Sequence, residues 1–85
     1  MYINIGGEQL VERNKIIAVF DIDKVTTDKI TREYLRAAEE KKSVISLSEE
    51  IPKSFIVVKK KEKEEVYISP LLVQTITKRM QREEL

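Results

Sequence analysis

Two aspartates, Asp21 and Asp23, are the residues whose types and spacing come nearest to catalytic chemistry in this sequence. They follow the apolar run at residues 16–20, which is rich in the β-branched and aromatic residues that favour a strand. Alternate residues of a strand point to the same face, so both carboxylates would project together at the strand end. Carboxylates in this arrangement can bind Mg²⁺, and one of them can attack a phosphate as a nucleophile.

The stretch at residues 19–25 resembles the opening of haloacid-dehalogenase-type phosphatases, where a hydrophobic strand leads into Asp-x-Asp. That family needs a much larger doubly wound domain, a downstream lysine and further acidic ligands, and 85 residues leave no room for them. We therefore interpret the aspartates as solvated carboxylates that lead into a helix. The sequence contains no histidine, no cysteine, no P-loop and no Ser/His/Asp set, so we expect no enzyme, no cofactor and no small-molecule substrate.

Basic side chains are the next candidates for a site. Lys29, Arg32 and Arg36 share one side of a predicted helix and could meet phosphates. Acidic partners four residues away make an ordinary solvated face the more economical interpretation. The run at residues 59–63 could follow a nucleic-acid backbone, but its interleaved glutamate favours a solubility role. The net charge of +1 gives the whole molecule little attraction for nucleic acid.

The length and composition predict one globular domain over residues 1–85, with 41% hydrophobic and 36% charged residues. No segment approaches the roughly 20 apolar residues of a membrane span. The first residues lack the basic head and apolar run of a signal peptide. We expect a cytoplasmic protein with no membrane partner.

The hydrophobic pattern predicts a small α+β domain, rich in antiparallel sheet, with the element order βββαβββα. Gly6 and Gly7 are typical of a hairpin turn, and a third strand would complete an antiparallel meander. Ser69 and Pro70 are typical of the cap and first residue of a helix. In chain order, the predicted elements are residues 2–5, 9–12, 16–22, 24–42, 43–47, 55–58 and 66–68, and a helix from residue 70 onward.

The spacing of apolar residues also predicts which side of the first helix is buried. Residues three and four apart lie on one side of a helix. Leu35 falls on the shoulder of the apolar side. The residues on that side are Thr27, Ile30, Tyr34, Ala37, Ala38 and Lys41.

Two wholly apolar runs, residues 16–20 and 55–58, predict strands that are covered on both faces. With only two helices, either one helix lies on each face or another subunit covers one face. Leu71 points away from the predicted apolar stripe of the second helix, so we place it in a subunit interface and expect a homo-oligomer. That stripe contains Leu72, Val73, Ile76 and Met80.

Four blocks of sequence, in order, carry a family resemblance. They are residues 1–6, residues 16–21, residues 52–58, and residues 67–71 with Thr75, Lys78 and Arg79 after them. Through these blocks the whole chain resembles the extracellular-matrix regulator B (RemB) family of Gram-positive bacteria, relatives of the RemA regulators. The resemblance implies a non-enzymatic regulator of biofilm-matrix gene expression. It also implies a ring that binds DNA through outer basic residues, on a fold similar to LytTR DNA-binding domains.

The resemblance further implies which residues meet DNA. An important arginine of RemA-like chains follows an asparagine before the central strand, and Lys15 after Asn14 is its counterpart here. An arginine pair precedes the fifth strand in those relatives, where this sequence has Lys53 alone. Lysine keeps the charge but not the two-pronged geometry of arginine. Arg13 and Lys29 are the nearby basic residues that we add to the predicted set.

Two functions from different classes remain open. The first is a regulator whose ring repeats a weak basic patch and so binds the phosphate backbone of duplex DNA. The second is an oligomeric scaffold or adaptor that binds proteins and not DNA, through the Leu71 side and the strand edges.

Overall fold

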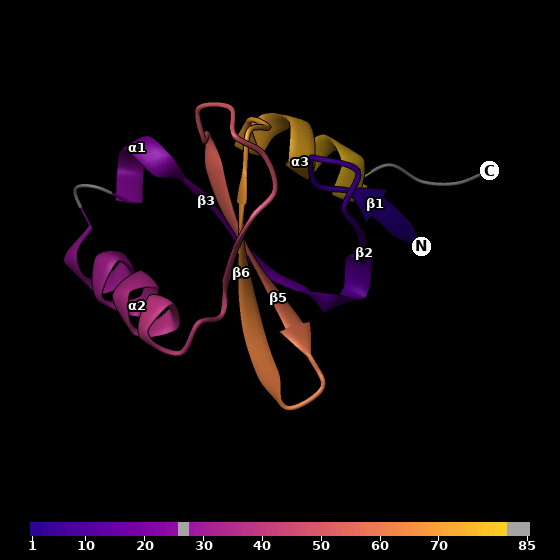
Figure 1. Cartoon of the computed structure of the whole chain (residues 1–85). Helices are drawn as coiled ribbons and strands as arrows, with labels where there is room; N and C mark the ends of the chain where they lie inside the picture. The colour runs from indigo at the N-terminus through magenta and orange to yellow at the C-terminus, as the bar shows by residue number, and fades with distance from the viewer. Residues whose placement is uncertain (26–27, 82–85) are drawn as a thin grey trace.

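The structure, a computed structural model, describes residues 1–25 and 28–81 and contains two sheets (Figure 1). One has two strands, and the other has four in the order β3-β5-β6-β4. The strands are β1 (Tyr2–Asn4), β2 (Leu10–Glu12), β3 (Ile16–Asp21), β4 (Val44–Ser46), β5 (Ser54–Lys60) and β6 (Lys63–Ser69). The helices are η1 (Arg13–Lys15, a 3₁₀ helix), α1 (Ile22–Val25), α2 (Lys29–Glu40) and α3 (Val73–Gln81).

The predicted α+β class and element order are confirmed, and the helix expected at residues 24–42 appears as α1 and α2. One pairing departs from an all-antiparallel sheet, because β4 runs parallel to β6. No helix in the described part of the chain is both long enough and apolar enough to cross a membrane.

The first hairpin forms where the glycine pair predicts it. β1 and β2 pair antiparallel, and Gly6 and Gly7 have φ angles of 121° and 54°, which glycine adopts readily. The predicted three-strand meander is wrong, because β3 pairs with β5 and not with β2. The 3₁₀ helix η1 between β2 and β3 turns the chain from the small sheet to the large one.

The two apolar runs take different places in the large sheet. β5 lies inside it, and Ile56, Val57 and Val58 are at most 3% exposed, which confirms a strand covered on both faces. β3 is an edge strand, and its Ile17 is 52% exposed. Residues of β3 still pack against the cores on both faces of the sheet, so the predicted coverage holds in part and fails at Ile17.

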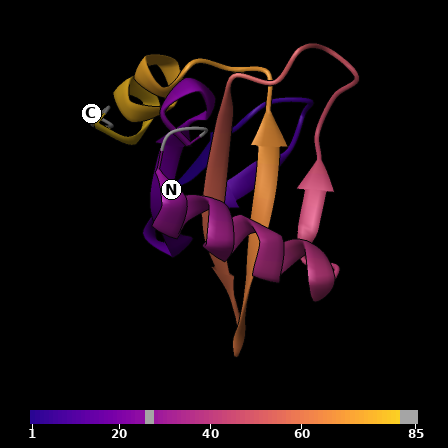
Figure 2. The ribbon, with the colours of Figure 1, turned by 90° about the vertical axis from the view of Figure 1, so that its left-hand side faces the viewer.

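The chain covers both faces of the large sheet by itself. On one face α2 packs over Val57 and Val66 (Figure 2). On the other face the β1–β2 hairpin and α3 supply Ile3, Val11 and Ile76 to a second core. Of the two arrangements left open by the sequence, the structure shows one helix on each face. Coverage of the sheet therefore gives no reason for a second subunit, and the homo-oligomer stays a prediction.

The buried side of helix α2 is rotated from the predicted one toward its shoulder at Leu35, and of the residues predicted on that side Ala38 is buried. Leu35 and Ala38 are its buried residues, whereas Ile30 is 79% exposed and Tyr34 36% exposed. Asp28 caps the helix, and its carboxylate accepts the N–H of Thr31 at 3.1 Å. Thr27, which the spacing predicts on the buried side, lies outside the described residues.

Helix α3 begins at Val73, three residues later than predicted. Ser69 does not cap it, because Ser69 is fully buried in β6 and its Oγ donates a 2.6 Å hydrogen bond to the carbonyl of Ile5. Leu71 and Leu72 consequently precede the helix. Leu71 packs against the core that contains Ile3, Val11 and Ile76, whereas Leu72 is 52% exposed, which reverses the predicted orientation of this pair.

Candidate functional site

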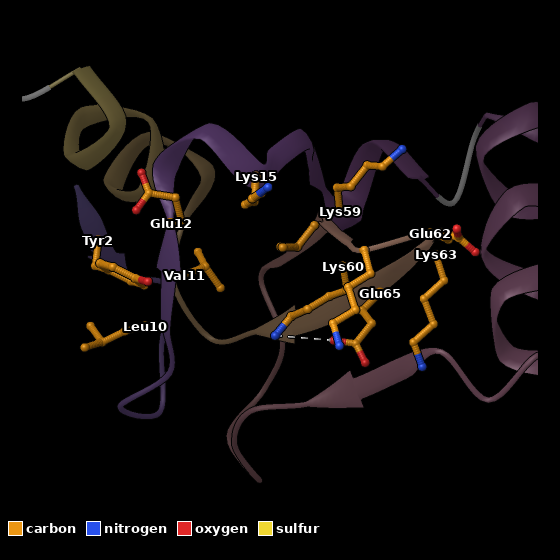
Figure 3. A pocket seen from close by; sticks show the side chains of 12 residues that line it. Tyr2, Leu10, Val11, Glu12, Lys15, Lys59, Lys60, Glu62, Lys63 and Glu65 are labelled. Carbon is orange, nitrogen blue, oxygen red and sulfur yellow. Dashed lines mark ion pairs between the residues drawn. The ribbon is translucent and has the colours of Figure 1, made fainter.

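An open groove of about 910 Å³ lies between the N-terminal hairpin and the tip of the β5–β6 hairpin (Figure 3). Its apolar wall includes Tyr2 and Leu10, which are 66% and 55% exposed. Its charged wall has five lysines and three glutamates, so cations are in excess. We call it the basic groove, and its charged residues are Lys15, Lys59, Lys60, Lys61, Lys63, Glu12, Glu62 and Glu65.

Strand pairing places the tip lysines. Lys60 pairs with Lys63, so that Lys61 and Glu62 alone form the turn. Lys61 adopts a φ of 53° without being glycine. The predicted hairpin tip is confirmed, although the strands continue further into the charged run than the sequence suggested. Because strand residues alternate, Lys60 lies on the same face as Val58, which is the face toward the N-terminal hairpin.

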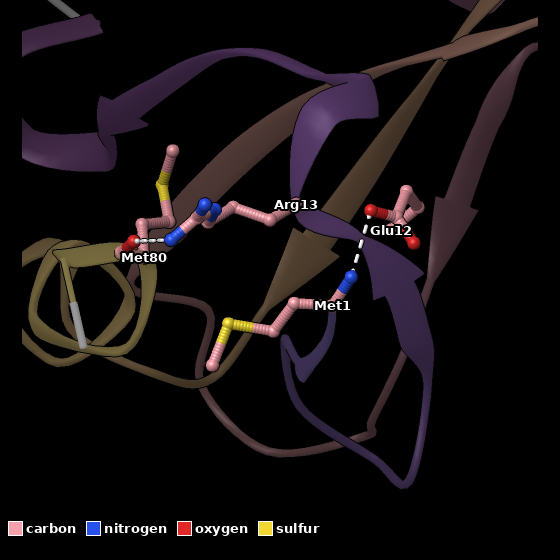
Figure 4. A network of polar contacts seen from close by, with 4 residues as sticks. All are labelled: Met1, Glu12, Arg13 and Met80. Atoms are coloured by element: carbon pink, nitrogen blue, oxygen red, sulfur yellow. Dashed lines mark hydrogen bonds and ion pairs between the residues drawn. The ribbon is translucent and has the colours of Figure 1, made fainter. Parts of the chain in front are cut away.

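Ion pairs occupy two of the three groove carboxylates. The N-terminal amine of Met1 lies 3.0 Å from Glu12 Oε1 (Figure 4). The Lys60 Nζ lies 3.8 Å from Glu65 Oε1. These pairs offset the acidic side chains, while the lysines at the turn and at the end of η1 are exposed. The groove therefore presents positive charge although the net charge of the chain is only +1.

Arg13, one of the predicted DNA contacts, is held by α3. Its Nη1 donates a 3.1 Å hydrogen bond to the carbonyl of Met80 (Figure 4). A cation at the carboxyl end of a helix also interacts favourably with the helix dipole. Arg13 is half-buried in this contact, which ties η1 to α3.

The structure does not gather the four predicted DNA contacts. Lys15 lies just before β3, beside the Ile16–Val58 pair, and Lys53 lies at the other end, beside the Asp21–Ser54 pair. A strand of six residues spans about 20 Å at about 3.3 Å per residue. Lys29 begins α2, away from the groove. The structure instead joins Lys15 to the tip lysines, for which the sequence pattern favours a solubility role.

The aspartate pair leads from β3 into a helix, as the sequence predicts. The Asp21 carboxylate accepts the N–H of Asp23 at 2.9 Å, and α1 begins at Ile22 between them. The first carboxylate thus shapes the turn from β3 into α1. Within residues 1–25 and 28–81, no group of three or more acidic residues is placed to hold a metal ion.

Tyr34 links α2 to the tip of the β5–β6 hairpin. Its hydroxyl donates a hydrogen bond to the carboxylate of Glu64. Partial burial, with smaller contributions from the hydrogen bond and the charge of Glu64, raises the pKa of Tyr34 to about 12. A phenol with a raised pKa favours the folded state while it is protonated.

We expect Tyr34→Phe to remove a pH-dependent part of the stability. For wild type, the contribution of Tyr34 is complete below its unfolded pKa of about 10 and is lost as pH rises through about 12. The difference in unfolding free energy between wild type and Tyr34→Phe should therefore shrink over that range. Urea titrations at several alkaline pH values measure it, with Tyr2→Phe as the exposed control. A constant difference would contradict the assignment.

The fold and the groove define the class of the protein: a small α+β domain with a lysine-rich groove at one end of its sheet. A family model described as RemA-like, extracellular matrix regulatory protein A-like, matches residues 2–80. The chain belongs to the RemA-like family. The match does not single out the regulator B branch, which stays a prediction, as does the likeness to LytTR domains. A comparison with curated proteins gives no significant match.

Proposed function

We propose that this protein regulates extracellular-matrix gene expression as an oligomeric, ring-shaped protein that binds duplex DNA. The observation that carries the proposal is the grouping of Lys15 with the tip lysines in one open groove. Exposed lysines suit phosphate oxygens, and contacts of this kind position a protein on DNA without reading its sequence. The RemA-like match supports the regulatory role. Lys53 and Lys29 are proposed as separate phosphate contacts outside the groove.

A salt titration of DNA binding tests this proposal. We expect the affinity of wild type for duplex DNA to fall steeply with ionic strength, because released counterions drive such binding. The variant Lys15→Gln/Lys60→Gln/Lys61→Gln should bind more weakly to every sequence. Its slope of log K against log salt should be smaller by about 1 for each phosphate that the variant no longer neutralises. Lys53→Gln, tested alone, should reduce the slope by about 1 if Lys53 also meets a phosphate.

Lys42→Gln is the matched control, because Lys42 is exposed in the turn after α2 and lines neither wall of the basic groove. It should bind like wild type. If wild type shows no salt-sensitive binding, the DNA-binding proposal is wrong. If the triple variant keeps the wild-type slope, the groove is not the contact surface.

Exposed apolar side chains favour a second candidate function, an oligomeric scaffold or adaptor that binds proteins. Tyr2 and Leu10 line the basic groove, and Ile17 and Leu72 are 52% exposed. Such side chains contribute little to binding phosphates, whereas they are common in the core of protein interfaces. This candidate predicts self-association without salt-sensitive DNA binding.

Aspartate substitutions at the neighbouring leucines test the interface proposed at Leu71. Leu71 packs on the core, and its carbonyl accepts a 2.9 Å hydrogen bond from the buried Ser54. We therefore expect Leu71→Asp to lower the unfolding free energy by about 2–4 kcal/mol. Leu72→Asp should keep the fold and shift the sedimentation profile to smaller species. An unchanged profile for the folded Leu72→Asp protein would remove this loop from the assembly interface.

A further inference from the structure

The loop between β4 and β5, residues 47–53, presents exposed acidic and apolar side chains together. Ile51 is 77% exposed, and Glu49 and Glu50 directly before it are exposed as well. Among the residues that the structure describes, neither glutamate forms an ion pair. We call residues 49–51 the acidic loop. Its negative charge and its isoleucine are both available to a partner.

Local contacts give the acidic loop a defined shape. The Ser48 hydroxyl accepts the N–H of Glu50 at 3.0 Å, and the Ser46 hydroxyl donates to the carbonyl of Ser48 at 3.0 Å. Pro52 restricts Ile51 to extended backbone conformations. A loop held in this way loses less conformational entropy on binding than an unrestrained loop.

The acidic loop and the lysines of the basic groove lie at opposite ends of the large sheet. The loop leads into β5 at Ser54, and the N–H of Lys53 donates to the Ser69 carbonyl at 2.8 Å. The tip lysines lie at the other end, where Lys60 pairs with Lys63. Figure 1 shows the loop at the top of the sheet and the β5–β6 turn at the bottom. Since β5 has seven residues at about 3.3 Å each, the loop of one copy does not reach the lysines of its own groove.

The two surfaces complement each other in polarity and in charge. The apolar wall of the basic groove offers the exposed Tyr2 and Leu10, which can bury Ile51. The groove has five lysines against three glutamates, whereas the acidic loop carries two carboxylates next to its isoleucine. Opposite charges on facing surfaces steer association and suppress wrong partners. A second copy of this chain therefore carries a segment that suits the groove.

We propose that the acidic loop of one copy binds the apolar wall of the basic groove of the next copy. Ile51 would pack against Tyr2 and Leu10, while Glu49 and Glu50 would face the lysines of the groove. The contact joins two different surfaces, so each added copy leaves one loop and one groove open until a ring closes. This is the subunit contact of the proposed ring, and it rests on the proposed function.

The contact also brings together two lysines that one copy keeps apart. Lys15 and Lys53 lie at opposite ends of β3 within one chain. Lys53 follows Ile51 by two residues, so the bound loop carries it to the end of the next copy that holds Lys15. The turn residue Lys61 stays at the rim of the groove. The surface that meets phosphates is then composite, because one copy supplies the groove and its neighbour supplies Lys53.

Sedimentation velocity of two single variants and of their mixture tests the contact. Ile51→Asp disables the loop and Leu10→Asp disables the groove wall. Both side chains are exposed, so both variants should fold, which circular dichroism and urea unfolding check. We expect each variant alone to associate about tenfold or more weakly than wild type. Their equimolar mixture should form a dimer, because the intact loop of Leu10→Asp fits the intact groove of Ile51→Asp.

Ile30→Asp is the matched control for these variants, because Ile30 is 79% exposed on α2 and belongs to neither surface. It should associate like wild type. Tyr2→Asp is a second groove variant, and it should also form a dimer with Ile51→Asp. A monomeric wild type, an unchanged profile for folded Ile51→Asp, or a mixture that stays monomeric would overturn the contact.

Salt titrations of DNA binding test the composite surface. We expect Lys53→Gln to reduce the slope of log K against log salt by about 1 in wild type. The same substitution should have little effect in the Ile51→Asp background, whose subunits are separate. Equal reductions in both backgrounds would overturn the composite surface. If wild type assembles through this contact and binds no DNA, the proposed DNA binding fails while the contact stands, so the two failures are distinguishable.

Discussion

Replacing Gly7 with alanine is expected to lower the unfolding free energy by on the order of 3 kcal/mol. Gly7 has a φ of +54°, which L-residues adopt at a cost. A Cβ at this position would also lie only 2.1 Å from the carbonyl oxygen of Leu47. That oxygen belongs to the backbone, so a rotamer change cannot relieve the contact, and the hairpin or the segment after β4 must move. Urea denaturation measures the loss, which corresponds to about 4–8 °C in Tm per kcal/mol for a domain of this size.

Glu8→Ala is the matched control for Gly7→Ala. Glu8 is the next residue of the same turn, has a φ of 65° and already carries an exposed side chain. Its replacement by alanine changes neither the backbone preference nor a close contact, so the expected effect lies within about 0.5 kcal/mol. Equal losses in both variants would contradict the assignment of the Gly7→Ala loss to the backbone strain and the contact with Leu47.

Local signals in the sequence were sufficient for some elements. The glycine pair predicted the β1–β2 turn, and the apolar run at residues 55–58 predicted a strand covered on both faces. The equally apolar run at residues 16–20 became an edge strand. Strand order decides this difference, and strand order depends on pairing between distant segments. The composition of one strand cannot distinguish a central strand from an edge strand whose faces are covered by helices or by another hairpin.

The error at the start of α3 has a long-range cause. Ser69 followed by proline looks like a helix start, but Ser69 Oγ donates to the carbonyl of Ile5, 64 residues away in the sequence. A buried carbonyl requires a donor, and this requirement outweighed a local capping preference. The shift left Leu71 on the core and Leu72 in solvent. The residues around Ser69 in the sequence do not indicate that its side chain bonds to the N-terminal hairpin.

The site was partly predictable. Resemblance to known regulators identified Lys15, and the structure joins it to a hairpin whose lysines were visible as a basic run. The sequence could not reveal which face of the sheet each charged side chain of this hairpin reaches. Strand register directs the side chains of Lys60 and Glu65 to the face that carries the N-terminal hairpin and those of Lys59 and Glu64 to the face that carries α2. Each face thus receives charges of both signs, and on one face Lys60 and Glu65 form an ion pair.

A duplex that spans several subunits of the proposed ring is expected to bind on the order of 10²–10⁴ times more tightly than a duplex of one helical turn. A single basic groove can neutralise few phosphates, and the net charge of +1 adds little general attraction. Useful affinity then requires several grooves on one molecule of DNA. Fluorescence anisotropy at one fixed ionic strength, with duplexes of about 10 base pairs and of several turns, measures the ratio.

The salt dependence of the two duplexes separates avidity from simple statistics. If grooves act together, the long duplex releases counterions from several subunits in one binding event, so its slope of log K against log salt must be steeper. If grooves act singly, the long duplex gains affinity only in proportion to its number of binding positions and keeps the slope of the short one. The Lys15→Gln/Lys60→Gln/Lys61→Gln variant provides the control. Because the substitutions weaken every groove of the assembly, their effects should multiply, and the long duplex should therefore be weakened more than the short duplex.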